Sequence, residues 1–116
     1  MTLILSVING AIADKNSKIY SRGDKLKIEE SIKIGRVGGS DLSLIIPREY
    51  GRVSKEHCKI DKHLLGGWTL CDLNSTNGTY VRIRGTLLRL TKEELKLEKD
   101  DVISLVKEVD LQVIEL

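Results

Sequence analysis

The segment WTLCDLNSTNGTYVRI, residues 68–83, joins two partly apolar stretches through a run of polar residues. Trp68 and Leu70 are two positions apart, which is the spacing of side chains on one face of a β-strand. Asn77 and Gly78 form a pair that favours a tight hairpin turn, because both residue types adopt the left-handed backbone at low cost. The segment is therefore expected to fold as a strand, a polar loop and a second strand.

The period-two alternation of this segment recurs along the chain and predicts further short strands. Turn-forming residues separate the apolar runs at intervals of roughly 8–12 residues, which is typical of an antiparallel sandwich or barrel. We therefore predict an all-β fold, an antiparallel β-sandwich of about eleven short strands. The alternating apolar pairs outside the quoted segment are Leu3 and Leu5, Leu26 and Ile28, Ile32 and Ile34, Leu44 and Ile46, Cys58 and Ile60, Ile103 and Leu105, and Leu111 and Val113.

The length and composition indicate one domain with an aliphatic core. A chain of 116 residues has room for one compact domain, here residues 1–116, because a second core would fall below the usual size for independent folding. With no Phe, one Trp and three Tyr, the core must consist mainly of Leu, Ile and Val, a composition that favours strands. The formal net charge is only +2, so binding of a polyanion would need a local cluster of basic residues.

The apolar opening MTLILSVINGAIA is similar to a secretory signal, but two features argue for a strand instead. No Lys or Arg precedes the apolar run, and Asn9-Gly10 interrupts it as a turn would. No segment approaches the roughly 20 apolar residues of a membrane span. We expect a protein with no membrane partner, located inside the cell in the nucleus or the cytoplasm.

The two cysteines are too few for a disulfide framework, which is compatible with a reducing compartment. Cys58 shares its strand parity with Ile60, whereas Cys71 alternates with Trp68 and Leu70. If those apolar residues share the core, the two thiols point to opposite faces, and no bridge between them is expected.

Three loop segments carry the residues with binding chemistry: Gly35-Arg36, Ser54-Lys55-Glu56-His57 and Asn74–Thr79. In this order and at this approximate spacing they resemble the signature of the forkhead-associated (FHA) family, which has a Gly-Arg pair, a Ser-x-x-His and an Asn-Gly-Thr turn. The resemblance covers essentially the whole chain. It implies an FHA-type sandwich whose loops at one end bind a phosphothreonine-containing partner protein, with no catalysis and no cofactor.

Arg36, Ser54 and Thr76 are assigned to the phosphate by this resemblance, and their chemistry fits that role. A phosphothreonine carries about −1.5 to −2 charges and three strong acceptor oxygens. The planar guanidinium of Arg36 can donate two parallel hydrogen bonds to a phosphate, and the two hydroxyl groups are short donors. Lys55 occupies a position that varies in the family, and it is included as a phosphate-binding residue for its second positive charge.

Four further residues are expected to shape the site without contacting phosphate. The carboxamide of Asn77 donates and accepts at once, so it is predicted to bind the main chain of the peptide. Gly35 is expected to let the chain turn out of the strand beside the arginine, and Gly78 is expected to supply the backbone freedom of the hairpin turn. The resemblance implies that His57 is buried and ties the loops together.

Two arginines are predicted to set the preference for residues after the phosphothreonine. Many members of the family have Asn where this chain has Arg84 before Gly85, so the rim of the peptide groove is expected to differ here. Arg52 lies two residues before Ser54 and would share its side of an extended segment, with Val53 pointing inward. We expect Arg52 to favour an acidic residue a few positions C-terminal to the phosphothreonine, with Arg84 as a competitor for that role.

Catalysis and metal binding are two other interpretations of these residues. Ser54 and His57 could be a nucleophile and a base, but no nucleophile elbow and no orienting acid accompany them. The two histidines and two cysteines could suggest zinc, but no Cys-x-x-Cys is present, and the neighbours His57 and Cys58 would point to opposite faces of a strand. We expect neither enzyme activity nor a metal site.

Two non-catalytic alternatives remain. Basic loop residues could bind nucleic acid, yet no stripe of aromatic residues for base stacking accompanies them. The runner-up function is a phosphate-independent interaction or oligomerisation module on the same fold, which an exposed apolar face would favour. We expect a monomer whose partner is a phosphothreonine protein and not a nucleic acid. The basic residues concerned are Arg36, Arg48, Arg52, Lys55, Arg82 and Arg84.

Overall fold

The computed structural model describes residues 2–91 and 93–116. Within these ranges it contains thirteen strands and no helix, and therefore no helix that could span a bilayer. The all-β prediction is confirmed, with thirteen strands in place of about eleven. The strands are β1 Leu3–Asn9, β2 Ala11–Asp14, β3 Ile19–Ser21, β4 Lys25–Ile28, β5 Ile32–Arg36, β6 Leu44–Ile46, β7 Cys58–Lys62, β8 Trp68–Asp72, β9 Thr79–Ile83, β10 Thr86–Arg89, β11 Leu95–Lys96, β12 Val102–Leu105 and β13 Val109–Glu115.

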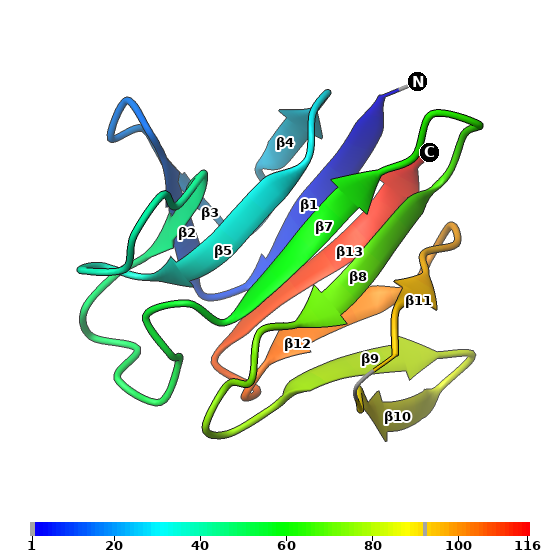
Figure 1. Cartoon of the computed structure of the whole chain (residues 1–116). Coiled ribbons are helices and arrows are strands. Elements are labelled where there is room, and N and C mark those ends of the chain that lie inside the picture. The colour runs from blue at the N-terminus through cyan, green and yellow to red at the C-terminus, as the bar shows by residue number, and fades with distance from the viewer. Residues whose placement is uncertain (1, 92) are drawn as a thin grey trace.

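The strands form two sheets that pack face to face as a sandwich (Figure 1). One sheet has six strands in the order β10-β9-β12-β13-β1-β4, and the other has seven in the order β11-β8-β7-β5-β6-β2-β3. One pairing departs from the antiparallel prediction, because β5 and β6 run parallel, with Arg36 beside Ile46. The reason is the loop 37–43, which carries the chain back along β5 before β6 begins.

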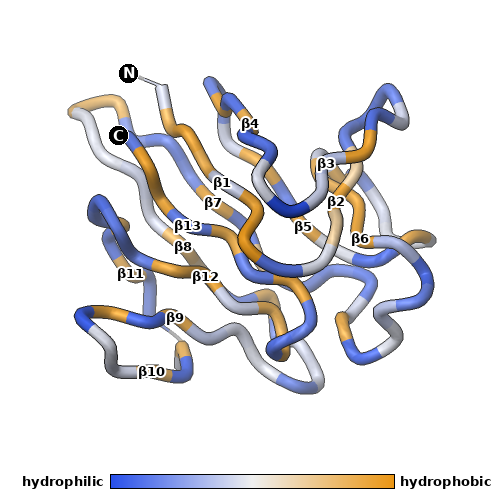
Figure 2. Tube along the Cα trace, turned by 180° about the vertical axis from the view of Figure 1, so that it is seen from behind, coloured by the Kyte–Doolittle hydropathy of each residue, from blue (hydrophilic) through white to orange (hydrophobic). Residues whose placement is uncertain are grey.

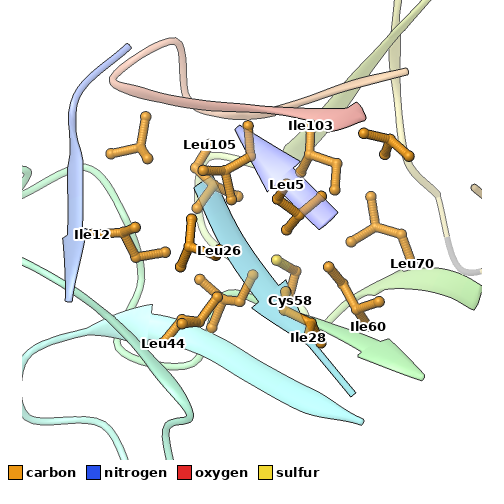
Figure 3. Packing of buried hydrophobic residues seen from close by; sticks show 14 of the residues in the cluster. Leu5, Ile12, Leu26, Ile28, Leu44, Cys58, Ile60, Leu70, Ile103 and Leu105 are labelled. Carbon is orange, nitrogen blue, oxygen red and sulfur yellow. The ribbon is translucent and has the colours of Figure 1, made fainter. Parts of the chain in front are cut away.

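The core lies between the two sheets and is mainly aliphatic (Figure 3). Leu3, Leu5 and Val7 of β1 are fully buried, whereas Ile4 and Ser6 between them are partly exposed. Such alternation places one face of each sheet in the core, where each fully buried aliphatic side chain contributes roughly 1.5–3 kcal/mol. Figure 2 shows the apolar segments mainly on the strands and the polar segments mainly in the connecting loops.

The two cysteines lie on opposite faces of the seven-stranded sheet. Cys58 is fully buried and lies opposite Asp72, whereas the half-buried Cys71 lies opposite Lys59. Because neighbouring positions of a strand alternate between faces, the two thiols point away from each other. Both are free, and burial raises the pKa of the Cys58 thiol.

Three loops meet at one end of the sandwich, and they contain most of the predicted site residues (Figure 1). They are the loops 37–43 between β5 and β6, 47–57 between β6 and β7, and 73–78 between β8 and β9. Because β6, β5, β7 and β8 are consecutive neighbours in one sheet, their connections at this end lie side by side.

The turn between β12 and β13 has no residue type that favours a turn, and it places two ordinary residues in the left-handed region. Val106 has φ of 56° and Lys107 has φ of 61°, while the N–H of Glu108 donates to the carbonyl of Leu105 at 3.1 Å. A two-residue hairpin turn with positive φ at both central positions normally contains Asn or Gly. This turn is therefore a point of local backbone strain.

Lys107→Gly is expected to raise the free energy of unfolding by about 0.5–1 kcal/mol, because glycine relieves the left-handed strain at an exposed position. Urea denaturation measures the change. The matched control is Lys15→Gly, at an exposed turn position whose φ is not positive. There, glycine only adds freedom to the unfolded chain, so a gain of equal size in both variants would contradict the explanation.

Candidate functional site

Arg36 ends β5, and two hydrogen bonds to the loop before β7 fix its position. Its backbone N–H donates to the carbonyl of Ser54 at 3.0 Å, and its Nε donates to the carbonyl of Val53 at 2.9 Å. Val53 is fully buried, so the acceptor of the Nε bond sits on an anchored residue. Among the described residues, no hydrogen bond or ion pair engages the terminal nitrogens of Arg36. The guanidinium is therefore fixed through Nε, and its two terminal nitrogens have no partner among the described residues.

Gly35 is required for space and not for a turn, which corrects the sequence-based interpretation. A Cβ atom on Gly35 would overlap the carbonyl of Lys55, and a Cβ atom on Gly39 would overlap the same carbonyl. Neither glycine has positive φ. The two glycines thus let the β6–β7 loop lie directly against β5 and the β5–β6 loop. Gly39 was missed as a site residue because a Gly-Gly pair ordinarily indicates only a turn.

Ser54 connects the loops on either side of it. Its backbone N–H donates to Nδ1 of His57 at 3.0 Å, and its Oγ accepts a hydrogen bond from the backbone N–H of Thr76 at 3.0 Å. The hydroxyl proton of Ser54 takes no part in these bonds. The structure thus brings Arg36, Ser54 and Thr76 to the same end of the sandwich, with Thr76 exposed.

His57 is fully buried and joins two loops through its ring. A backbone N–H can only donate, so the bond from Ser54 requires an unprotonated Nδ1, and Nε2 then carries the proton and donates to the carbonyl of Gly78 at 2.8 Å. Burial lowers the pKa of His57, although the Gly78 carbonyl and the charge of Asp72 oppose that shift. The neutral imidazole is therefore the form that fits this position.

The conformation of the 73–78 loop depends on Asp72 and Ser75, two residues that the sequence analysis missed. Asp72 Oδ1 accepts from the hydroxyls of Ser75 at 2.6 Å and Thr79 at 2.7 Å, and Oδ2 accepts from the N–H of Ser75 at 3.1 Å. The Oγ of Ser75 accepts from the backbone N–H of Gly78. Gly78 has a positive φ of 90°, a conformation that glycine adopts at low cost, as the hairpin prediction required. An Asp at the end of a strand and before a polar loop is a recognisable turn signal, because its side chain can bond to nearby backbone N–H groups.

Asn77 is partly exposed, and one side of its amide is already bonded within the protein. Its Nδ2 donates to the carbonyl of Arg52 at 2.8 Å and so links the β8–β9 loop to the β6–β7 loop. The Oδ1 atom has no hydrogen bond among the described residues. One amide proton of Asn77 is therefore used in a contact between the loops, while its Oδ1 and its second amide proton have no partner among the described residues.

Three cations lie in or beside the site loops. Arg36, Arg52 and Lys55 form no ion pair among the described residues, and Glu56 next to Lys55 is bound by Lys33 at 2.7 Å. The side chain of Lys55 extends along Gly38, with its Cε 3.4 Å from where a Cβ of Gly38 would lie. An anion that approaches these loops can therefore meet three cationic side chains, although the loops also carry the exposed carboxylates of Asp41 and Glu49.

Arg84 lies away from the site, which corrects its predicted position at the groove rim. It has φ of 50° in the turn between β9 and β10, whereas the site loop joins the other end of β9 at Gly78 (Figure 1). A five-residue strand separates them, which corresponds to about 16 Å. Arg52, by contrast, is exposed within the site loops, although its segment consists of turns and is not extended.

Comparison with known proteins agrees with this geometry. The model of the FHA domain family matches residues 32–106, which include all three loops. The chain belongs to the FHA family. Comparison with curated protein sequences finds no match.

Solved structures of other FHA domains have the same fold. An FHA domain from a study of phosphothreonine-dependent FHA interactions is 26% identical over 100% of this chain and 98% of its own, with a TM-score of 0.64. The FHA domain of FhaA, solved in complex with the intracellular domain of Rv3910, is 28% identical over 96% and 98%, with a TM-score of 0.61. An Arabidopsis thaliana FHA domain, 24% identical over 99% and 86%, has a TM-score of 0.70 and supports the fold. Together with the family match, these neighbours support an interaction module that binds phosphopeptides.

The arrangement of Ser54 and His57 in this FHA domain is not that of a nucleophile and its base. Nδ1 of the imidazole accepts from the backbone of Ser54 and not from its hydroxyl, and Nε2 is bonded to Gly78. Both ring nitrogens are therefore occupied in a buried position. The zinc interpretation also lacks a cluster, since the described residues contain no group of three His, Cys, Asp or Glu side chains suited to a metal.

Acidification is expected to destabilise the FHA domain through His57. Because burial lowers its folded-state pKa below the usual 6.5, the unfolded chain binds the proton first and stability falls as the pH decreases below about 6.5. The loss is at most about 1.4 kcal/mol per pH unit. The His63→Asn variant leaves His57 as the only histidine, so its NMR titration reports the folded-state pKa of His57, and urea unfolding at pH 7.5 and 5.5 measures the change in stability. A His57 pKa at or above 6.5 in the folded protein would contradict the assignment.

Proposed function

We propose that this FHA domain binds a phosphothreonine peptide of a partner protein, reversibly and without chemistry. The observation that carries the proposal is the cluster of Arg36, Ser54 and Thr76, which hydrogen bonds between the loops hold at one end of the sandwich. The guanidinium tip and the two hydroxyl protons are the groups left to bind an anion. A phosphate has three acceptor oxygens, which suits this set of donors.

Lys55 and Asn77 extend the proposed site beyond these three groups. Lys55 supplies a second cation whose stem lies along Gly38, so its ammonium can approach the phosphate from the β5–β6 loop. The unbonded Oδ1 and second amide proton of Asn77 would bind the main chain of the peptide beside the phosphothreonine. Phosphate would then supply most of the affinity, and Asn77 would orient the peptide.

The rival functions receive less support from the same observations. Arg82 and Arg84 lie on β9 and at its far end, apart from the loop cations, so the basic residues do not form one continuous track for nucleic acid. Trp68 is fully buried and unavailable for base stacking. A phosphate-independent module would have no need for an arginine fork that is anchored at Nε and unpaired at its tip.

A phosphothreonine peptide should bind, and its unphosphorylated form should not. Arg36→Ala removes two charge-assisted hydrogen bonds of roughly 1.5–3 kcal/mol each, so the affinity should fall on the order of a hundredfold or more. Arg36→Lys restores the charge without the fork and should recover only part of it. Isothermal titration calorimetry measures the affinities.

Arg84→Ala is the matched control for this experiment, because it removes an exposed arginine at the far end of β9. Its affinity for the phosphopeptide should equal that of the wild type. Equal affinities of the wild type for the phosphorylated and unphosphorylated peptides would instead favour the phosphate-independent module.

Arg52 is proposed to select an acidic residue after the phosphothreonine. Its carbonyl is held by Asn77 and its exposed side chain has no ion-pair partner among the described residues, so it can contact the peptide. A peptide with Asp at the third residue after phosphothreonine should bind roughly 1.5–5-fold more tightly than one with Ala. Fluorescence anisotropy at two salt concentrations should show the preference weakening with salt.

Arg52→Ala should abolish this preference, and Arg84→Ala should leave it unchanged. Selectivity that is identical in the wild type and in Arg52→Ala would show that Arg52 is only a solvated loop residue. Loss of selectivity in Arg84→Ala but not in Arg52→Ala would instead assign the preference for the acidic residue to Arg84.

A further inference from the structure

Arg89 is the last residue of β10 and lies at the end of the sandwich that carries the site. In the antiparallel pairing of β10 with β9, Arg89 faces Tyr80, the second residue of β9. The backbone N–H of Leu90 donates to the carbonyl of Thr79, the first residue of β9, at 2.8 Å. Since Gly78 joins β9 to the site loop, the end of β10 returns to that loop.

The side chain of Arg89 lies against the 73–78 loop. A Cβ atom placed on Gly78 would be 2.7 Å from Nε of Arg89, 3.0 Å from its Cζ and 3.2 Å from its Nη2. The Cζ atom also lies 5.9 Å from the ring centroid of Tyr80, within the range of a cation–π attraction. Gly78 and Tyr80 thus confine the guanidinium beside Asn77, the residue proposed to bind the main chain of the peptide.

The charge of Arg89 is not used within the described part of the chain, where its guanidinium has no hydrogen bond and no ion pair. Asp72 lines the same pocket as Arg89, but both of its carboxylate oxygens accept hydrogen bonds from the loop or from β9. Glu93 and Glu94 border Arg89 in a different pocket, and neither forms an ion pair with it. The exposed guanidinium is therefore available to a ligand.

A pocket of about 510 Å³ adjoins Arg89 on the side of the site loop. Asn74 and Ser75 line it from the loop, and Leu90 and Thr91 line it from the end of β10. Pockets for small ligands begin at roughly 300 Å³, so this one has room for an amino-acid side chain. A polar wall with one unpaired cation suits an acidic side chain.

We propose that Arg89 binds an acidic side chain that lies N-terminal to the phosphothreonine in the peptide. The proposal rests on the phosphothreonine binding proposed above and adds a sequence preference on the side of the phosphate that Arg52 does not reach. The sequence analysis missed Arg89 because the residue lies outside the three loop segments. Its position at the site follows from the return of β10 along β9.

The order of contacts across the site indicates the direction of the peptide. Thr76 and Asn77 bond to the loop that carries Arg52, whereas Gly78 contacts Arg89. The 73–78 loop therefore lies between the two arginines. A peptide whose main chain is bound by Asn77 crosses this loop in an extended conformation. Since the residues after the phosphothreonine are assigned to Arg52, those before it extend towards Arg89.

Phosphothreonine peptides with alanine at the flanking positions test the proposal. One series carries a single Asp at the first, second, third or fourth position before the phosphothreonine, and fluorescence anisotropy measures each affinity. At one of these positions or more, the Asp peptide should bind roughly 1.5–5-fold more tightly than the all-alanine peptide, the range of a partly exposed ion pair. This preference should weaken as the salt concentration rises.

Arg89→Gln removes the charge but keeps a planar polar group, and it should abolish the preference. Arg89→Lys restores the charge without the planar fork and should recover part of it. Arg82→Gln is the matched control, because it removes the same charge from an exposed arginine on the same face of β9 as Tyr80. Its Nη1 donates to the carbonyl of Gly85 at 3.1 Å, beyond the far end of β9, so this variant should keep the preference.

The ratio of the Asp and Ala affinities separates this proposal from the phosphothreonine binding on which it rests. An equal ratio in the wild type and in Arg89→Gln, with the phosphorylated peptides still bound more tightly than the unphosphorylated ones, would overturn the role of Arg89 alone. Equal loss of the preference in Arg82→Gln would reveal a general charge effect and would also overturn it. So would an effect of Arg89→Gln confined to an Asp after the phosphothreonine. Equal binding of phosphorylated and unphosphorylated peptides would overturn both proposals.

Discussion

The imidazole of His57 holds together the end of the sandwich that carries the site. Its Nδ1 accepts from the backbone of Ser54, and its Nε2 donates to the carbonyl of Gly78, so one buried side chain joins two loops that are distant in sequence. Its own N–H bonds to Ile34 of β5, and its carbonyl accepts from Leu73. Every backbone and ring group of this residue is thereby used, and an unpaired buried group would cost about 1–3 kcal/mol.

The other contacts of the site depend on that arrangement. Thr76 can bond to the Oγ of Ser54 only where the 73–78 loop lies against the loop before β7, and Asn77 reaches the Arg52 carbonyl across the same boundary. Arg36 in turn takes its position from the Val53 and Ser54 carbonyls. Removal of the imidazole would therefore loosen the 47–57 and 73–78 loops together and, with them, the carbonyls that position Arg36.

Most of the fold and the three loops that meet at one end of the sandwich could be predicted from the sequence, the fold from local alternation and the loops from their resemblance to the FHA signature. Alternation of apolar residues identified the long strands, and the Gly-Arg, Ser-x-x-His and Asn-Gly-Thr segments identified the loops. The strands β3 and β11 are three and two residues long, too short for any alternation to be recognised. The parallel pairing of β5 with β6 depends on the path of loop 37–43, which no residue pattern indicates.

What could not be predicted concerns contacts between segments far apart in the chain. Gly35 is needed because the β6–β7 loop brings the Lys55 carbonyl close to β5, and no local pattern indicates that approach. The bond from the Asn77 amide to the Arg52 carbonyl likewise depends on how closely two loops approach each other. Arg84 was misplaced for a related reason. Its position follows from the direction in which β9 leaves the site, and a turn signal after a strand does not say which end of the sandwich the turn occupies.

The hydrogen bonds between the loops also bear on how a phosphate could be bound with useful affinity. Ordering a long side chain on binding costs roughly 0.5–1.5 kcal/mol, and ordering loops adds to that cost. Here Nε of Arg36 is already bonded to Val53, and Ser54 already accepts from Thr76, so part of this ordering is completed during folding. Lys55 lacks such an anchor, and its exposed chain has more freedom to lose. The anchored arginine therefore loses less conformational entropy than the lysine when a phosphate binds, and the lysine contributes mainly through its charge.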